Sequence, residues 1–174
     1  MTKTKKLIRH INLTCILLQS IGVFFLYQSI ERFYIAFYHK VFECLNILFD
    51  RPICLTGLGQ ECKELFPTRT VGQFFTNKFY CAAGGVFLFV IFLGLLRKHK
   101  ATGLVQAIVV LFISFFLLLI GAMRNMTIWG LINDFFFKFS KEILTAFFSS
   151  GLTLFLIAMT FFLWSIRYDE KHYS

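Results

Sequence analysis

The sequence predicts an all-α membrane protein in which four transmembrane helices form one bundle, with an amphipathic helix and a cysteine-bearing turn in the first outer loop. Of 174 residues, 57% are hydrophobic and 25 are Phe, whereas soluble domains have an apolar content of roughly 45–50%. The mean hydropathy is +0.71. Four long stretches contain no Asp, Glu, Lys or Arg, namely residues 11–30, 79–96, 103–123 and 143–166.

The lengths of these stretches fit membrane-spanning helices. A hydrocarbon core about 30 Å thick needs about 20 helical residues to cross it. Strands of a transmembrane barrel would instead alternate apolar and polar residues, and residues 86–96 and 109–121 do not. The stretch 79–96 is the shortest, but its small residues Ala82 to Gly85 allow a neighbouring helix to approach closely. We therefore expect a single four-helix transmembrane domain over residues 1–174.

The first stretch is expected to remain in the protein as a span and not to be cleaved as a signal peptide. It follows a basic start, as signal peptides do. However, its apolar run exceeds the roughly 7–15 residues of a signal sequence, and residues 28–31 lack a small-x-small cleavage pattern.

The positions of the cations predict that both termini lie in the cytoplasm. With that orientation, nine cations and two acids fall in very short inner segments, while nine cations and seven acids are spread over the outer loops 31–78 and 124–142. Lys and Arg concentrate near span ends on the cytoplasmic side. The inner cations are Lys3, Lys5, Lys6, Arg9, Arg97, Lys98, Lys100, Arg167 and Lys171. A plasma membrane is favoured over an internal one.

The first outer loop, residues 31–78, contains a helical pattern. Over residues 32–50, apolar residues recur every three or four positions, at Phe33, Phe37, Val41, Cys44 and Leu48. The sequence predicts an amphipathic helix that lies along the membrane surface or continues the first span outward. The second outer loop, 124–142, shows a shorter version of the pattern and is expected to pack on the first loop or on the bilayer.

Cysteine placement predicts a disulfide on the outer side. Cys54 and Cys62 flank a short Gly-containing turn, and closing it would stabilise the fold by about 2–3 kcal/mol in the chain-entropy model. Two unpaired thiols, or a bond between Cys44 and Cys81, are the alternatives. Cys15 is expected to pack within the membrane. The absence of a C-x-x-C pair argues against a thiol oxidoreductase.

Residues suited to chemistry are few. The histidines lie in four different segments and none is four residues from another, so no metal site or cofactor is expected. The four stretches hold no ionisable Asp, Glu, Lys or Arg, which weakens proton-coupled transport. Their polar residues are expected to bond between helices or back to a carbonyl one turn earlier: Gln19, Ser20, Gln106, Ser114, Ser149, Ser150 and Thr153.

The chain shares several features with a known family. They are the order of the loops, residues 59–63 (Gly-Gln-Glu-Cys-Lys), Trp129, Asp134-Phe135 and residues 142–151. On these features the chain resembles the claudin and peripheral-myelin-protein superfamily of four-span proteins. Residues 50–54 (Asp-Arg-Pro-Ile-Cys) replace the Gly-Leu-Trp that precedes the family's first loop cysteine. The resemblance implies a four-span adhesion, scaffold or auxiliary protein.

Three functional hypotheses follow. The first is a non-catalytic adhesion, organising or auxiliary subunit whose partners are the lipid bilayer and another membrane protein or a second copy, not nucleic acid. The second is a small membrane enzyme or transporter with an outer-face polar cluster formed by Arg32, His39, Glu43 and Arg124. The third is an accessory subunit of a respiratory or secretory complex.

Overall fold

The structure is a computed structural model that describes residues 12–50, 70–97, 100–124, 135–140 and 142–173. Within them the chain is helical and contains no strand. The five principal helices are α2 (Leu13–Phe37), α3 (His39–Asp50), α5 (Thr70–Leu96), α6 (Lys100–Arg124) and α8 (Ile143–Tyr173).

Four of these helices are long and apolar enough to cross a membrane, which confirms the predicted fold class. The candidate spans are Leu13–Phe37, Gly72–Leu96, Lys100–Ile120 and Ile143–Asp169. The protein is therefore a multi-pass integral membrane protein. Helix α2 starts after Asn12, whose side-chain oxygen accepts a 3.0 Å hydrogen bond from the backbone N–H of Thr14, as an N-cap residue does.

The helices extend beyond the charge-free stretches by which they were predicted. Helix α2 continues past Ile30 through Glu31 and Arg32, and α5 begins nine residues before Phe79. The candidate spans therefore contain charged residues, at Glu31, Arg32, Lys78, Lys100, Arg167 and Asp169. The four stretches themselves contain no Asp, Glu, Lys or Arg, and the charged residues lie in the parts of the helices beyond them.

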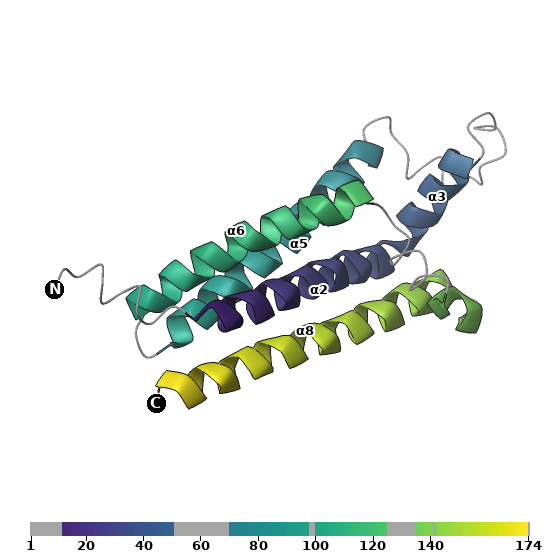
Figure 1. The fold of residues 1–174 in the computed structure, drawn as a ribbon. Coiled ribbons are helices and arrows are strands. Elements are labelled where there is room, and N and C mark those ends of the chain that lie inside the picture. Colours follow the sequence, from purple (N-terminus) through teal and green to yellow (C-terminus); the bar gives the residue numbers. More distant parts are fainter. Residues whose placement is uncertain (1–11, 51–69, 98–99, 125–134, 141, 174) are drawn as a thin grey trace.

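The amphipathic segment predicted over residues 32–50 belongs to two helices. Residues 32–37 form the end of α2, and α3 follows after a break at Tyr38, where the backbone has φ −110° and ψ 32°. Hydrogen bonds from Tyr38 N–H to the Tyr34 carbonyl and from Phe42 N–H to the Tyr38 carbonyl cross the break. Helix α3 thus follows the first span after a bend (Figure 1).

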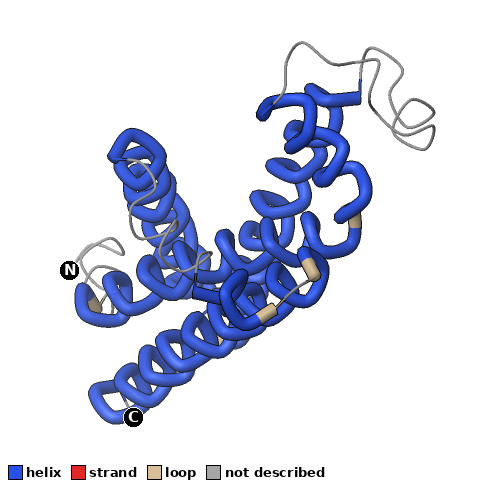
Figure 2. Tube along the Cα trace, turned by 90° about the vertical axis from the view of Figure 1, so that its right-hand side faces the viewer, coloured by secondary structure: helices blue, strands red, loops and turns tan. Residues whose placement is uncertain are grey.

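Helix α2 is the central helix of the bundle. Its most extensive contact is with α8, and it also packs against α5 and α6, which form a hairpin (Figure 1). We call the end that holds the start of α2, the α5–α6 turn and the finish of α8 the terminal end, and the opposite end the loop end. Towards the loop end, α6 diverges from the other helices (Figure 2).

The middle of the bundle is an apolar core to which all four spans contribute. Val23, Val90, Val110 and Ala158 are buried in it, one from each span. The Phe162 ring of α8 reaches Phe89 of α5 with ring centroids 4.9 Å apart. Phe162 also lies over Gly22, where an added Cβ would be 3.1 Å from the ring. Gly22 thus permits the close approach of α2 and α8.

At the loop end, Phe147 joins three parts of the chain. Its ring contacts Phe42 of α3 at 5.1 Å and Phe137, in a short helix over residues 135–139, at 5.4 Å. The described part of the second loop therefore packs on α8, on the same Phe147 ring that α3 contacts. An open groove of about 400 Å³ lies between residues 135–140 and the first turns of α8.

The described cysteines decide one of the predicted pairings. Cys81 is a free, exposed thiol, so the alternative bond between Cys44 and Cys81 is wrong. Cys44 is buried in α3. Cys54 and Cys62 lie outside the described residues, and the bond predicted between them stays a prediction.

Candidate functional site

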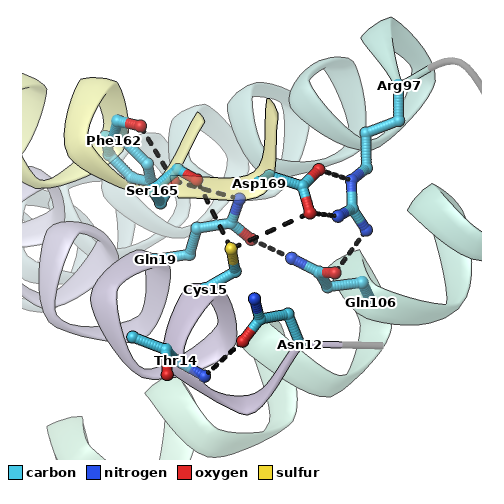
Figure 3. Close-up of polar contacts among 9 residues, drawn as sticks. All are labelled: Asn12, Thr14, Cys15, Gln19, Arg97, Gln106, Phe162, Ser165 and Asp169. Atoms are coloured by element: carbon cyan, nitrogen blue, oxygen red, sulfur yellow. Dashed lines mark hydrogen bonds and ion pairs between the residues drawn. The ribbon is translucent and has the colours of Figure 1, made fainter. Parts of the chain in front are cut away.

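A cluster of polar side chains from three of the spans and from the residue that follows the α5 span lies at the terminal end, and we name it the terminal polar cluster. Helix α2 supplies two members, α6 one and α8 two, and the residue after α5 supplies the sixth. The members are Cys15, Gln19, Arg97, Gln106, Ser165 and Asp169, and their side chains converge between the helices (Figure 3).

The centre of the cluster is a bidentate ion pair between Arg97 and Asp169. Arg97 Nε donates to Asp169 Oδ2 at 2.8 Å, and a second guanidinium nitrogen donates to Oδ1. The side chains are 18% and 23% exposed, respectively. A planar guanidinium fits a carboxylate in this two-bond geometry, which also fixes orientation. The pair therefore ties α8 to the end of α5.

Two glutamine side chains extend the ion pair to α6 and α2. Arg97 donates from its remaining terminal nitrogen to the Gln106 side-chain oxygen, and Gln106 Nε2 donates to Gln19 Oε1 at 3.0 Å. Gln19 Nε2 then donates to Ser165 Oγ at 3.3 Å, which returns the chain of bonds to α8. Gln106 is only 1% exposed, so these bonds replace water for a buried amide.

Cys15 and Ser165 complete the cluster beneath the ion pair. The Cys15 thiol is fully buried, 3.4 Å from the Ser165 carbonyl oxygen and 3.9 Å from Asp169 Oδ1. The Ser165 hydroxyl donates to the Phe162 carbonyl oxygen at 2.8 Å, a bond within α8. Cys15 is therefore packed, as expected, and also contacts the carboxylate.

The α5–α6 turn positions Arg97 and Gln106 through two glycines. An added Cβ on Gly103 would lie 2.0 Å from the Gly94 carbonyl oxygen, and one on Gly94 would lie 2.9 Å from the Gly103 oxygen. Real Cβ atoms do not approach an oxygen so closely, so the helices touch backbone to backbone here. This contact brings the end of α5 level with Gln106.

The space enclosed by the cluster is small. A cavity of about 10 Å³ is bounded by Gln19, Arg97 and Gln106 together with apolar residues of α5, α6 and α8. That volume is about the minimum that one water molecule requires. The cluster therefore joins helices and leaves no room for a larger molecule.

A second set of charged side chains lies nearer the loop end. Glu31 of α2 and Lys78 of α5 form an ion pair at 3.0 Å, with side chains 17% and 19% exposed. Arg32 is buried on α2 and donates to the carbonyl and side-chain oxygens of Gln28, both at 3.1 Å. Beside it, Ser29 donates to the Gly151 carbonyl oxygen of α8 at 2.7 Å.

The predicted outer-face cluster is spread over three helices. Arg32 is buried in α2, His39 is half-buried at the start of α3, and Glu43 is exposed one turn later. Arg124 is the last residue of α6, and its side chain is outside the described part. Among the described side chains, no hydrogen bond or ion pair joins these residues to one another.

The polar residues predicted to bond between or along helices do so in most cases. Gln19 and Gln106 bond between helices, Ser150 donates to the Phe147 carbonyl, and Thr153 donates to the Ser149 carbonyl. The hydroxyls of Ser20 and Ser114 are buried and have no hydrogen-bond partner among the described residues.

Sequence reasoning missed Arg97 and Asp169 as members of a site, because both were assigned to basic segments outside the membrane. Among the residues that the structure describes, no three His, Cys, Asp or Glu side chains group closely enough to hold a metal ion. Comparison of the chain with protein-family models, curated proteins and solved structures found no match.

Proposed function

We propose that this multi-pass membrane protein is non-catalytic and acts as an adhesion, organising or auxiliary subunit through its outer loops and the outward faces of its helices. The observation that carries the proposal is the filled terminal polar cluster. Its side chains bond to one another across four helices, and the cavity among them has the volume of about one water molecule. These polar groups are used to hold the bundle together, which leaves its surface to interact with partners.

The hairpin of α5 and α6 offers the largest share of uncovered span surface. Only 22% of the α5 span and 28% of the α6 span are buried, compared with 39% for α2 and α8. The segment of α6 after Ser114 contains no buried residue up to Ile120, because this part diverges from the bundle. Lipid covers such a surface by default, and helix–helix packing with another membrane protein covers it equally well.

The proposal includes the orientation that the cations predict. Both termini face the cytoplasm and the loop end faces outward, in a plasma membrane. An even number of spans is consistent with termini on one side. The concentration of Lys and Arg in the short segments at the terminal end supports the cytoplasmic assignment.

The resemblance to claudins and peripheral myelin proteins supports the general class of four-span organising protein. The described part of the first loop is the helix α3, in a region where that superfamily has β-strands. The proposal therefore covers adhesion and organisation and does not extend to sealing or pore lining.

Cross-linking in native membranes tests the proposal, and a native cysteine provides the attachment site for the cross-linker. Cys81 is a free, exposed thiol within the α5 span, so a lipid-soluble maleimide carrying a photoreactive group attaches there. We expect a discrete protein adduct, either a dimer or a complex with one membrane protein, which is absent from the Cys81→Ser variant. A monomer that gives only lipid adducts and purifies alone in mild detergent would overturn the proposal.

A second candidate, a transporter or enzyme with a site at the outer face, is favoured by one observation. Arg32 is 4% exposed within a candidate span, and ionisable residues inside membrane helices often serve function. If the protein is such a transporter or enzyme, Arg32→Gln abolishes its activity while the purified chain keeps its helix content. If Arg32 is structural, the same variant lowers thermal stability and affects no activity directly.

A further inference from the structure

Among the side chains that the structure describes, two cations at the terminal end have no acidic partner. Asp169, the one acidic side chain that the structure describes at this end, is already bonded to Arg97. Lys100 at the start of α6 and Arg167 near the end of α8 are both exposed. Neither forms an ion pair with a described side chain. These two exposed cations are therefore available to an anion outside the protein.

The length of α8 places Arg167 at the depth of lipid headgroups. The helix has 31 residues and is about 46 Å long, whereas the hydrocarbon core is about 30 Å thick. If Ile143 marks one boundary of the hydrocarbon, the other boundary falls about 20 residues later, close to Trp164. Trp164 is 59% exposed, and Trp side chains concentrate at this boundary. Arg167 lies about 4.5 Å farther along the helix.

Exposed apolar residues lie directly on the membrane side of both cations. Leu163 and Trp164 precede Arg167 by four and three residues, so they share its face of α8. At the α5–α6 turn, Leu95 and Leu96 are exposed at the end of α5, at the same end of the bundle as Lys100 (Figure 1). A ligand that meets both features has a negative headgroup attached to a hydrocarbon chain.

We propose that the terminal end binds anionic phospholipids, with Lys100 and Arg167 contacting the headgroup phosphates and the adjacent apolar residues contacting the acyl chains. This inference goes beyond the proposed function and does not depend on any protein partner. A soluble anion such as nucleic acid or free phosphate satisfies the cations but not the apolar side chains beside them. A phospholipid satisfies both, and it is present at this depth in any membrane.

Lipid titration of the purified full-length chain tests the proposal. The chain is titrated in detergent with phosphatidylglycerol and with phosphatidylcholine of identical acyl chains, and bound lipids are counted by native mass spectrometry. We expect preferential retention of phosphatidylglycerol. The Lys100→Gln/Arg167→Gln variant loses about 25-fold in phosphatidylglycerol affinity, since each cation near an anionic surface contributes a factor of about five, or roughly 1 kcal/mol.

A matched control separates the site from overall charge. Lys40→Gln/Lys138→Gln removes two exposed cations from the loop end and should leave the affinity within about twofold of the starting chain. Helix content measured by circular dichroism verifies that both variants remain folded. Equal retention of the two lipids by the unmodified chain, or equal losses in the two double variants, would overturn the proposal. Displacement of the bound lipid by glycerol phosphate would also overturn it, because the acyl chains would then contribute nothing.

Discussion

Asp169→Asn should loosen the attachment of α8 at the terminal end by about 2 kcal/mol. The substitution keeps the shape of the side chain and removes the charge that faces Arg97. An exposed ion pair contributes up to about 1 kcal/mol, whereas removing one partner of a fully buried pair costs about 3–5 kcal/mol. With side chains 18% and 23% exposed, this pair lies between those limits.

The thiol of Cys15 reports the loosening directly. It is fully buried and lies 3.9 Å from Asp169 Oδ1, so a maleimide reaches it only when the cluster opens. In a Cys81→Ser background, the fraction of Cys15 labelled over time is read by peptide mass spectrometry. A change of about 2 kcal/mol raises the labelling rate about 25-fold, because the rate follows the population of the open form. Rates in denaturant correct for differences in intrinsic thiol reactivity.

Glu43→Gln is the matched control, since it removes an exposed carboxylate from α3 at the loop end. Its labelling rate should stay within about twofold of the background protein. The double variant Arg97→Gln/Asp169→Asn should be less destabilised than the sum of the single variants, because the two residues form one interaction. A rate for Asp169→Asn within threefold of the control, in a folded protein, would refute the assignment of the ion pair as the attachment of α8.

Three further predictions concern packing and cysteine pairing. Gly103→Ala should lower the free energy of unfolding by about 1–3 kcal/mol, because its Cβ would lie 2.0 Å from a backbone oxygen of α5. Gly84→Ala is the control, because a Cβ at Gly84 meets nothing within 4 Å. Equal melting temperatures of the two variants would contradict the close contact at Gly103. Phe147→Ala should cost about 3–5 kcal/mol and increase hydrogen exchange in α3, and unchanged exchange there would show that this ring does not hold the helix. Peptide mapping without reduction tests the predicted bond between Cys54 and Cys62, and a bond from either to the cysteine of α3 would refute it.

The four spans could be predicted because hydrocarbon acts on each helix separately. A run such as residues 143–166 needs no partner to identify it, since its own composition makes insertion favourable. The ends of the helices were harder to predict. Charges at Glu31 and Arg32 were taken to end the first span, yet α2 continues through both, because Lys78 pairs with one and Gln28 accepts hydrogen bonds from the other.

The terminal polar cluster could be predicted only in part. Gln19 and Gln106 were expected to bond between helices, because a primary amide in an apolar helix needs a partner. Arg97 and Asp169 are 72 residues apart, and both sit in charged segments that are typical of span ends. Which helices adjoin each other depends on packing, at positions such as Gly103 and Gly22, and the hydropathy of one helix does not contain that information.

The order of synthesis gives the central position of α2 a consequence for assembly. Of the four candidate spans that the structure describes, α2 is made first and has its principal partner in α8, which is made last, whereas α5 and α6 are neighbours in sequence and can pair as soon as both are inserted. Until α8 arrives, one side of α2, including Gln19 and Ser29, faces lipid without the acceptors it later contacts. Ribosomes stalled before Ile143 should therefore yield a chain that is fully inserted in the membrane but recognised by quality-control proteases as incomplete.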